Sequence, residues 1–228
     1  RRHTRYIGDW SSDVCSSDLN GVSAVSVGVA KGKSVSKAPE YPADHAKPVV
    51  FYGTSITQGG CASRPGMVHT AILGRRFDRP VLNVGFSGNG RMDAAVGDFL
   101  VQIDAAVYVI DCLPNMGAAD VREKCIPLVK QLRAARPDTP IVLVEDRRNT
   151  NSWILPKRNQ HHTDNHAALR ECFAKLQQEG IKGLFYLAGD DLLGRDDEGA
   201  TDGSHPSDLG FVRQADAFEP VLRAALKR

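Results

Sequence analysis

The chain has 228 residues, of which 42% are hydrophobic and 25% are charged. Its 29 basic and 27 acidic residues leave a formal net charge of +2, and their interspersed order gives no indication of a nucleic-acid partner or an anionic membrane partner. No apolar run approaches the roughly 18 residues that a membrane-spanning helix needs. The cysteines lack CxxC or Cys/His metal-ligand spacing, so we expect reduced thiols.

Two amino-terminal segments differ in pattern from the rest of the chain. Residues 1–19, RRHTRYIGDWSSDVCSSDL, have neither apolar periodicity nor a signal-peptide core, and in one reading frame they match a translated sequencing-library primer. We interpret them as an adapter artefact that is not native. In residues 20–47, the valines between 22 and 29 predict one or two strands, followed by a polar, proline-containing linker. Because two strands cannot bury a core alone, we interpret this segment as the remnant of a truncated β-domain; packing of the strands on the main domain is the alternative.

From residue 48 to residue 228, short apolar runs alternate with helical patterns. The runs are apolar at successive positions, as parallel strands covered on both faces are. They lie at 48–52, 80–84, 106–111, 140–144 and 183–187. This order predicts an α/β fold, a three-layer α/β/α sandwich with a doubly wound, five-stranded parallel sheet of the flavodoxin-like kind.

Four stretches in this part of the chain carry apolar residues at helical spacing. They span 92–103, 121–132, 166–176 and 209–222. Their expected buried faces include Phe99 in the first stretch and Leu209 in the last. Pro127 is expected to kink or restart the second helix, because it lacks a backbone donor and its ring crowds the preceding turn.

Small and polar residues follow the expected strands. The five positions are Ser55, the glycine-rich loop 85–90, Asn115, Glu145 and the segment 202–206 before the last helix. Because the carboxyl ends of parallel strands meet at one edge of the sheet, where open α/β sheets bind ligands, we expect these residues to share one crevice.

Acyl transfer from an ester requires the same residue types. It needs a hydroxyl nucleophile, a base, a carboxylate that orients the base, and donors for the developing oxyanion. Asp202 and His205, three residues apart in a glycine-containing turn, can set one imidazole nitrogen on the carboxylate and leave the other facing Ser55. Each residue alone has a simpler explanation as a helix cap, loop residue or turn former. These separate explanations, however, leave it to coincidence that all of the residues occur at the same edge of the sheet.

The set resembles the SGNH hydrolase superfamily, also called GDSL-type esterases and lipases. The resemblance covers residues 49–211 in four blocks: Gly53-Thr54-Ser55, NVGFSG at 83–88, Asn115, and DGSHP at 202–206. The segments FYGTSITQGGCASRPG, DCLPNM and DGSHP are similar to those of a bacterial subgroup in which this domain follows a small β-sandwich. Such a β-sandwich would account for residues 20–47.

The resemblance implies a role for each matching residue. Ser55 is the nucleophile, His205 is the general base, and Asp202 orients it. The backbone N–H groups of Ser55 and Gly88 and the side-chain amide of Asn115 form the oxyanion hole.

The chain departs from the family pattern at two positions. Thr54 stands where an aspartate usually precedes the nucleophile, and Met116 rather than aspartate follows Asn115. Neither change removes a group that the chemistry requires.

Nucleotide binding and metal binding are the rival interpretations of these motifs. The loop 85–90 lacks GxGxxG spacing, and no Walker-type Gly-Lys-Ser/Thr occurs. The histidines His161, His162 and His166 and the acidic run 190–198 lack ligand-loop spacing, so we interpret them as solvated faces. We therefore expect no cofactor and no metal.

The sequence thus predicts a carboxylic ester hydrolase that acts through an acyl-enzyme on a small-molecule or carbohydrate ester. The architecture is similar to that of several carbohydrate deacetylases, which implies short acyl groups on a sugar. An acyltransferase with the same triad and a noncatalytic carbohydrate-binding module are the alternatives. Glu145 and Trp153 are candidate pocket residues; the alternatives are a surface ion pair for Glu145 and ordinary packing for Trp153.

Overall fold

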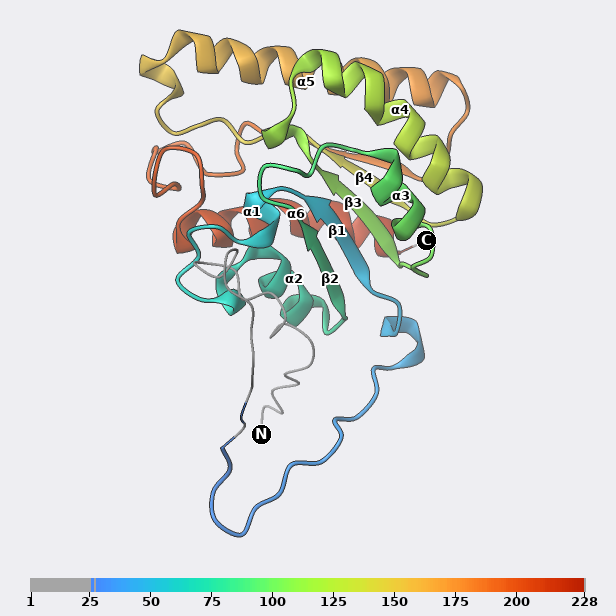
Figure 1. Ribbon diagram of the computed structural model, residues 1–228, viewed down its shortest axis with the longest axis vertical. Helices are drawn as coiled ribbons and strands as arrows, with labels where there is room; N and C mark the ends of the chain where they lie inside the picture. The colour runs from blue at the N-terminus through green and yellow to red at the C-terminus, as the bar shows by residue number, and fades with distance from the viewer. Residues whose placement is uncertain (1–25, 27, 228) are drawn as a thin grey trace.

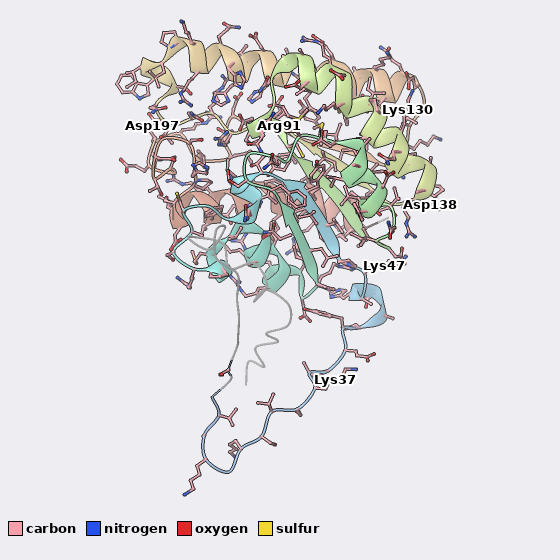
Figure 2. All side chains as sticks on the ribbon, in the orientation of Figure 1. Lys37, Lys47, Arg91, Lys130, Asp138 and Asp197 are labelled. Atoms are coloured by element: carbon pink, nitrogen blue, oxygen red, sulfur yellow. The ribbon has the colours of Figure 1, made fainter. Side chains whose placement is uncertain are left out.

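The computed structural model describes residues 26 and 28–227 (Figure 1). The segment interpreted as an adapter artefact lies outside the described residues, as do most of the positions for which amino-terminal strands were predicted. Residues 28–47 contain the 3-10 helix η3 (Ala43–His45) and no strand. They lead toward the sheet as an extended segment on which Lys37 lies (Figure 2), and the ion pair between Lys47 and Asp104, with N and O 3.0 Å apart, fixes the end of this segment to the body.

The sheet is five-stranded and parallel throughout, with strand order β2-β1-β3-β4-β5. The strands are β1 (Val49–Gly53), β2 (Val81–Gly85), β3 (Val107–Asp111), β4 (Ile141–Val144) and β5 (Leu184–Leu187). This order confirms the predicted doubly wound topology. The direction of winding reverses at β1, so the crevice expected at a topological switch point lies at its carboxyl end, where Gly53 pairs in register with Gly85 and Asp111.

Helices cover both faces of the sheet. The α-helices are α1 (Ser55–Gln58), α2 (His69–Phe77), α3 (Ala94–Leu100), α4 (Ala118–Ala135), α5 (Pro156–Gln178) and α6 (Asp208–Leu226). Short 3-10 helices are η4 (Pro65–Met67), η5 (Leu113–Asn115) and η6 (Ser152–Ile154). Helices α3, α4 and α5 lie on one face, and α2 and α6 lie on the other (Figure 1). Within residues 26 and 28–227, no helix combines the length and apolar character needed to cross a membrane.

Successive strand residues enter two separate cores. In β1, Val50 and Tyr52 pack with α3, α4 and α5, whereas Val49 and Phe51 pack with α2 and α6. The same alternation runs through β3 and β4 because consecutive side chains point to opposite faces of a strand. Both faces are covered, which explains why these strands are apolar at successive positions until β3 ends at Asp111. Full burial of one such side chain contributes about 1.5–3 kcal/mol.

The helical faces differ from prediction at two aromatic or aliphatic positions. Phe99 is 70% exposed, because α3 begins only at residue 94 and buries Gly97 and Leu100. Leu209 is 46% exposed, and Phe211 occupies the core in its place. Phe211 lies four residues before Ala215, so it continues the buried stripe of α6.

Helix α4 is continuous through Pro127, so of the two predicted alternatives, a kink or a restart, the restart does not occur. Cys125 and Leu128 are buried on either side of the proline and hold both halves against the core.

His69 begins α2 as a fully buried, uncharged residue. Its ring stacks on Phe211 with centroids 5.9 Å apart and contacts Phe51 and Phe218 at 5.6 and 5.2 Å. Neither ring nitrogen has a hydrogen-bond partner within the described part of the chain. Burial lowers the pKa of His69 to about 3.

Acid should therefore unfold the protein partly through His69. Between the ordinary pKa of 6.5 and about 3, the unfolded chain binds a proton that the folded chain does not. The free energy of unfolding should then fall by up to about 1.4 kcal/mol per pH unit as the pH drops through this window. In His69→Phe the contribution of His69 to this slope should be lost, whereas His161→Phe, at an exposed site, should keep it. Superimposable urea-unfolding profiles of wild type and His69→Phe from pH 7 to 4 would contradict this account.

Candidate active site

The turn after β1 presents Ser55 with its hydroxyl available for chemistry. Thr54 is the N-cap of α1, and its side-chain oxygen accepts a hydrogen bond from Ile56 N at 3.2 Å. Capping therefore falls to Thr54, the residue that departs from the SGNH pattern, and not to Ser55. Thr57 fixes the short helix to β3 by donating to the Asp111 carboxylate at 3.1 Å.

Ser55, His205 and Asp202 form one continuous hydrogen-bonded chain. Ser55 Oγ lies 3.0 Å from His205 Nε2, and His205 Nδ1 lies 2.7 Å from Asp202 Oδ2. The other carboxylate oxygen, Asp202 Oδ1, accepts from the backbone N–H groups of Ser204 at 2.9 Å and His205 at 2.7 Å. The turn thus fixes the position of the Asp202 carboxylate. The carboxylate in turn orients the His205 imidazole so that Nε2 faces Ser55.

The electrostatics of the turn keep Asp202 ionised. Partial burial raises its pKa, but hydrogen bonds from the backbone and ring of His205 and from the Ser204 backbone outweigh burial and bring the pKa to about 2. A permanent carboxylate at Nδ1 leaves Nε2 as the proton acceptor and stabilises the imidazolium that forms.

The loop 86–90 lies directly on the nucleophile turn. Phe86 N donates to Gly53 O at 3.0 Å, and a Cβ on Gly90 would stand 1.8 Å from the same oxygen. Gly88 has φ of +69°, a left-handed conformation that favours glycine. Among the described residues, no acceptor bonds the backbone N–H of Ser55 or of Gly88. Both donors are thus available to a ligand.

Asn115 ends η5 and lies against the same loop. In one orientation its amide nitrogen is 3.4 Å from Phe86 O. In the other, its oxygen accepts from Asn89 N and Gly90 N at 3.3 Å each, which satisfies the amide better. The structure therefore brings Asn115 to the loop that contains Gly88.

A pocket of about 390 Å³ includes Ser204, whose backbone N–H donates to Asp202 of the triad, in its lining. It is lined by Pro114, Asp146, Arg147, Asn149, Lys157, Arg158, His161, His162 and Ser204. Pro114 precedes Asn115 in the chain, and Ser204 precedes His205, so the lining includes the sequence neighbours of the expected oxyanion donor and of the base. Arg147 ties this wall together, because its guanidinium donates to Ser204 O at 3.0 Å and also to Ser204 Oγ and the Asp146 carboxylate.

Neither of the two candidate pocket residues lines this pocket. Glu145 is fully buried and accepts hydrogen bonds from Arg170 at 2.6 Å, Tyr186 at 2.7 Å and Gly189 N at 2.9 Å. It holds β4, β5 and α5 together and does not line the pocket. Trp153, in η6, is 74% exposed and is also absent from the pocket lining.

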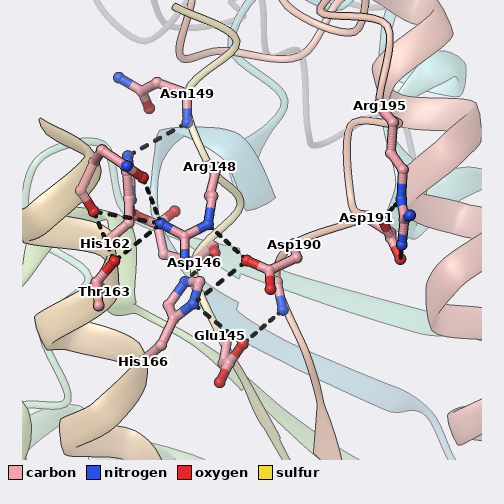
Figure 3. A network of polar contacts seen from close by, with 12 residues as sticks. Glu145, Asp146, Arg148, Asn149, His162, Thr163, His166, Asp190, Asp191 and Arg195 are labelled. Carbon is pink, nitrogen blue, oxygen red and sulfur yellow. Dashed lines mark hydrogen bonds and ion pairs between the residues drawn. The ribbon is translucent and has the colours of Figure 1, made fainter. Parts of the chain in front are cut away.

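A buried polar network, which includes some of the pocket-lining residues, was not predicted from the sequence (Figure 3). His162 bonds Asp146 through Nδ1 at 2.9 Å and accepts from Asn149 N at 3.3 Å. His166 Nε2 donates to Asp146 O at 2.6 Å. Both histidines are buried, so the interpretation of this cluster as a solvated face is wrong for them. Their spacing of four, in phase with buried Leu169, was the available signal.

The acidic run 190–198 is held by arginines. Asp190 pairs with Arg148 at 2.7 Å, and Asp191 pairs with Arg195 at 2.6 Å. Asp196 pairs with Arg213 at 2.6 Å. These carboxylates are thus charge-compensated surface groups.

Cys61 is an exposed thiol at the rim of the triad. Its sulfur, an Asp202 carboxylate oxygen and a His205 ring nitrogen lie within 4.8 Å of one another. Burial, and in second place the charge of Asp202, raises the pKa of the Cys61 thiol. The other three described cysteines, Cys112, Cys125 and Cys172, are buried.

Alkylation of Cys61 should therefore block the site. We expect iodoacetamide to lower hydrolysis of 4-nitrophenyl acetate roughly tenfold or more, and faster as the pH rises, because the thiolate is the reactive form. Cys61→Ala should be active and resist the reagent, with Cys112→Ala as the matched variant that remains sensitive. Equal loss of activity in Cys61→Ala would show that this thiol is not at the rim of the functional site.

Comparison with known proteins gives one family match and several structural likenesses. The model of the GDSL-like Lipase/Acylhydrolase family matches residues 46–223. A protein of Bacteroides ovatus ATCC 8483, described as a GDSL-like lipase, is 35% identical with a TM-score of 0.77; the match covers 79% of this chain and 54% of that one. No curated protein matches the chain.

Two further solved structures share the fold at lower identity. The salicylyl-acyltransferase SsfX3 from a tetracycline biosynthetic pathway is 21% identical with a TM-score of 0.68, over 78% of this chain and 55% of that one. A family two carbohydrate esterase from Clostridium thermocellum, in complex with cellohexaose, is 14% identical with a TM-score of 0.61, over 84% and 68%. The chain spans just over half the length of the Bacteroides protein and of SsfX3.

Proposed function

The chain belongs to the GDSL-like lipase/acylhydrolase family, and from this membership we propose that it is a serine ester hydrolase with Ser55 as nucleophile, His205 as general base and Asp202 as the residue that orients the base. The observation that carries the proposal is the unbroken chain of hydrogen bonds, 3.0 Å from Ser55 to His205 and 2.7 Å from His205 to Asp202. A binding module has no need of these three groups in proton-relay order.

The reaction proceeds in two half-steps. Ser55 Oγ attacks the ester carbonyl while His205 Nε2 takes the hydroxyl proton, and the tetrahedral intermediate expels the alcohol, which leaves with that proton. Water then gives a proton to His205 and attacks the acyl-enzyme. Collapse of the second intermediate returns the proton to Ser55 and releases the carboxylic acid.

Three donors stabilise the negative oxygen in both half-steps. They are the backbone N–H groups of Ser55 and Gly88 and the side-chain amide of Asn115. The unpartnered state of the two backbone groups, and the contact of Asn115 with the loop 86–90, support this assignment. Donors fixed before the reaction need no reorganisation when charge develops.

Loss of the Asn115 amide should slow the chemical step. We expect Asn115→Ala to lower kcat by roughly 10²–10³-fold with little change in KM, because the oxyanion is present only along the reaction path. Asn89→Ala serves as the control, since Asn89 lies on the same loop and its side chain donates to Ser87 O, while its backbone N–H is unaffected by the substitution. A decrease in kcat of less than about tenfold in Asn115→Ala would indicate that Asn115 only shapes the turn and does not act as an oxyanion donor.

The substrate class that fits best is a short acyl ester of a carbohydrate. The fold likeness to a carbohydrate esterase supports it. The second candidate is acyl transfer to an alcohol, which the fold likeness to a salicylyl-acyltransferase favours. The same triad serves both, because only the acceptor that meets the acyl-enzyme differs.

The domain organisation is also part of the proposal. Residues 48–228 form the SGNH hydrolase domain, and residues 20–47 are the end of a preceding β-sandwich and its linker. The family match beginning at residue 46 supports this boundary. We retain the interpretation of residues 1–19 as an adapter artefact on their sequence alone.

A panel of esters tests the proposed function. It comprises 4-nitrophenyl esters of increasing acyl length and acetylated sugars, each with and without an added alcohol acceptor. We expect Ser55-dependent hydrolysis that is fastest for acetyl esters. Transfer that outpaces hydrolysis would support the second candidate, and activity that persists in Ser55→Ala would contradict both.

A further inference from the structure

Positive charge is concentrated in the pocket beside the triad. The lining contains Arg147, Lys157 and Arg158 against a single acid, Asp146. The whole chain, by contrast, carries a formal net charge of only +2 among 228 residues. The basic character is therefore local to this pocket and does not reflect the composition of the protein.

Two of these cations are available to a ligand. Lys157 and Arg158 are exposed, and neither side chain has a hydrogen-bond or ion-pair partner anywhere in the described part of the chain. Every other basic residue near the pocket is engaged: Arg147 binds Asp146 and Ser204, and Arg148 binds Asp190. Unpaired cations beside a cavity attract an anion without first having to break an internal ion pair.

The acids near the pocket are already neutralised. Asp146 is buried and bonds both Arg147 and His162. Burial raises the pKa of Asp146, but its contacts with Arg147 and His162 outweigh burial and lower it, so it is a paired carboxylate. Asp202 directs both oxygens to His205 and Ser204. Neither acid therefore cancels the charge of Lys157 and Arg158.

The backbone adds to the positive potential. Lys157 and Arg158 are the second and third residues of α5, a helix of 23 residues whose N-cap, Leu155, makes no side-chain cap bond. A helix of this length presents a partial positive charge at its amino end.

The position of the pocket assigns its occupant to one side of the ester. Ser204 in the lining is adjacent to His205, the group that delivers the proton to the leaving alcohol. The part of the substrate nearest the base is the alcohol, so a pocket on the Ser204 side of the triad is open to the alcohol moiety and not to the acyl group.

We propose that this pocket selects esters whose alcohol part carries a negative charge, namely acylated sugars bearing a carboxylate or a sulfate, with Lys157 and Arg158 as the specificity-determining residues. The proposal rests on the proposed function of the triad. It narrows the substrate class from carbohydrate esters in general to acidic ones.

Matched pairs of sugar esters test this selection. The first pair is a mono-acetylated methyl glucuronoside and its uronamide, which differ only in the charge of one group. The second pair is an acetylated methyl glucoside with and without a sulfate. We expect the wild type to favour each anionic member roughly tenfold in kcat/KM, mainly through KM, and the preference to shrink at high salt.

Charge reversal then identifies the residues responsible. In the double variant Lys157→Glu/Arg158→Glu the preference, measured as the ratio of kcat/KM for the anionic and the neutral member of each pair, should disappear or invert. Lys175→Glu makes the same change in the last turn of α5 and should keep the wild-type preference.

The outcomes separate the two proposals. Ser55-dependent hydrolysis of both members of each pair at equal rates would overturn the acidic-sugar proposal and leave the esterase proposal intact. A preference for an anionic acyl group, seen with succinyl against butyryl esters of methyl glucoside, together with none for an anionic alcohol would also overturn it. Absence of Ser55-dependent acetate release from any of these esters or from 4-nitrophenyl acetate would contradict both proposals.

Discussion

We expect His205→Ala to lower kcat for 4-nitrophenyl acetate by about 10⁴-fold, with KM changed little. His205 Nε2 is the only base bonded to Ser55 Oγ among the described residues, so the variant leaves the serine hydroxyl with no acceptor for its proton. Steady-state rates on purified wild type and variant measure the effect. Unfolding midpoints should agree closely, because His205 is partly exposed and its ring bonds only the other two members of the triad.

Two further measurements on this variant separate catalysis from folding. Added imidazole should restore part of the activity of His205→Ala, because it can enter the space left by the side chain and accept the proton. His45→Ala, which removes a histidine bonded to Asp78 O outside the site, should retain full activity. Loss of less than about a hundredfold in His205→Ala would exclude His205 as the general base.

Asp202→Asn should also lower kcat by about 10⁴-fold. The amide is close in shape to the carboxylate and can still accept from the backbone N–H groups of Ser204 and His205, so the turn is preserved. An amide that donates to Nδ1, however, shifts the imidazole proton to Nε2, where it faces Ser55 and cannot accept. The same substitution also removes the charge that stabilises the imidazolium.

The control for this variant is Asp197→Asn. Asp197 lies in the preceding loop (Figure 2) with φ of +62°, a conformation that asparagine tolerates well. It should keep wild-type activity. More than about one-tenth of wild-type activity in Asp202→Asn would contradict the role of Asp202 in orienting the base.

The sheet and the triad could be predicted from sequence because their signals are local. Buried parallel strands are apolar at successive positions, and each of the four motif blocks is a short stretch read without knowledge of its partners. Ser55 and His205 are 150 residues apart, yet Ser55 comes shortly after a recognisable strand and His205 shortly before a recognisable helix. The topology then brings the carboxyl ends together.

The surroundings of several side chains could not be predicted from the sequence, because they depend on contacts between distant segments. Nothing adjacent to Glu145 indicates that its partners are Arg170, Tyr186 and Gly189, from α5, β5 and the segment after β5. Phe99 and Phe211 show the same difficulty, because apolar spacing indicates that a helix has a buried face but does not determine which residues at its edges contact the sheet.

The buried histidines connect this hidden network to the chemistry. His162 binds Asp146, which binds Arg147, and Arg147 binds Ser204 beside the base. The turn that carries Asp202 and His205 is therefore fixed from α5 as well as by its own hydrogen bonds. This arrangement explains why polar residues on the inner face of α5 are buried.

Covalent labelling of the nucleophile tests the central claim most directly. A fluorophosphonate probe reacts with a serine only when an adjacent base activates it, and peptide mapping by mass spectrometry locates the adduct. We predict a single adduct on Ser55 in the wild type, strongly reduced labelling in His205→Ala and none in Ser55→Ala. Undiminished labelling of Ser55→Ala, or an adduct on another residue, would contradict the assignment of Ser55 as the nucleophile.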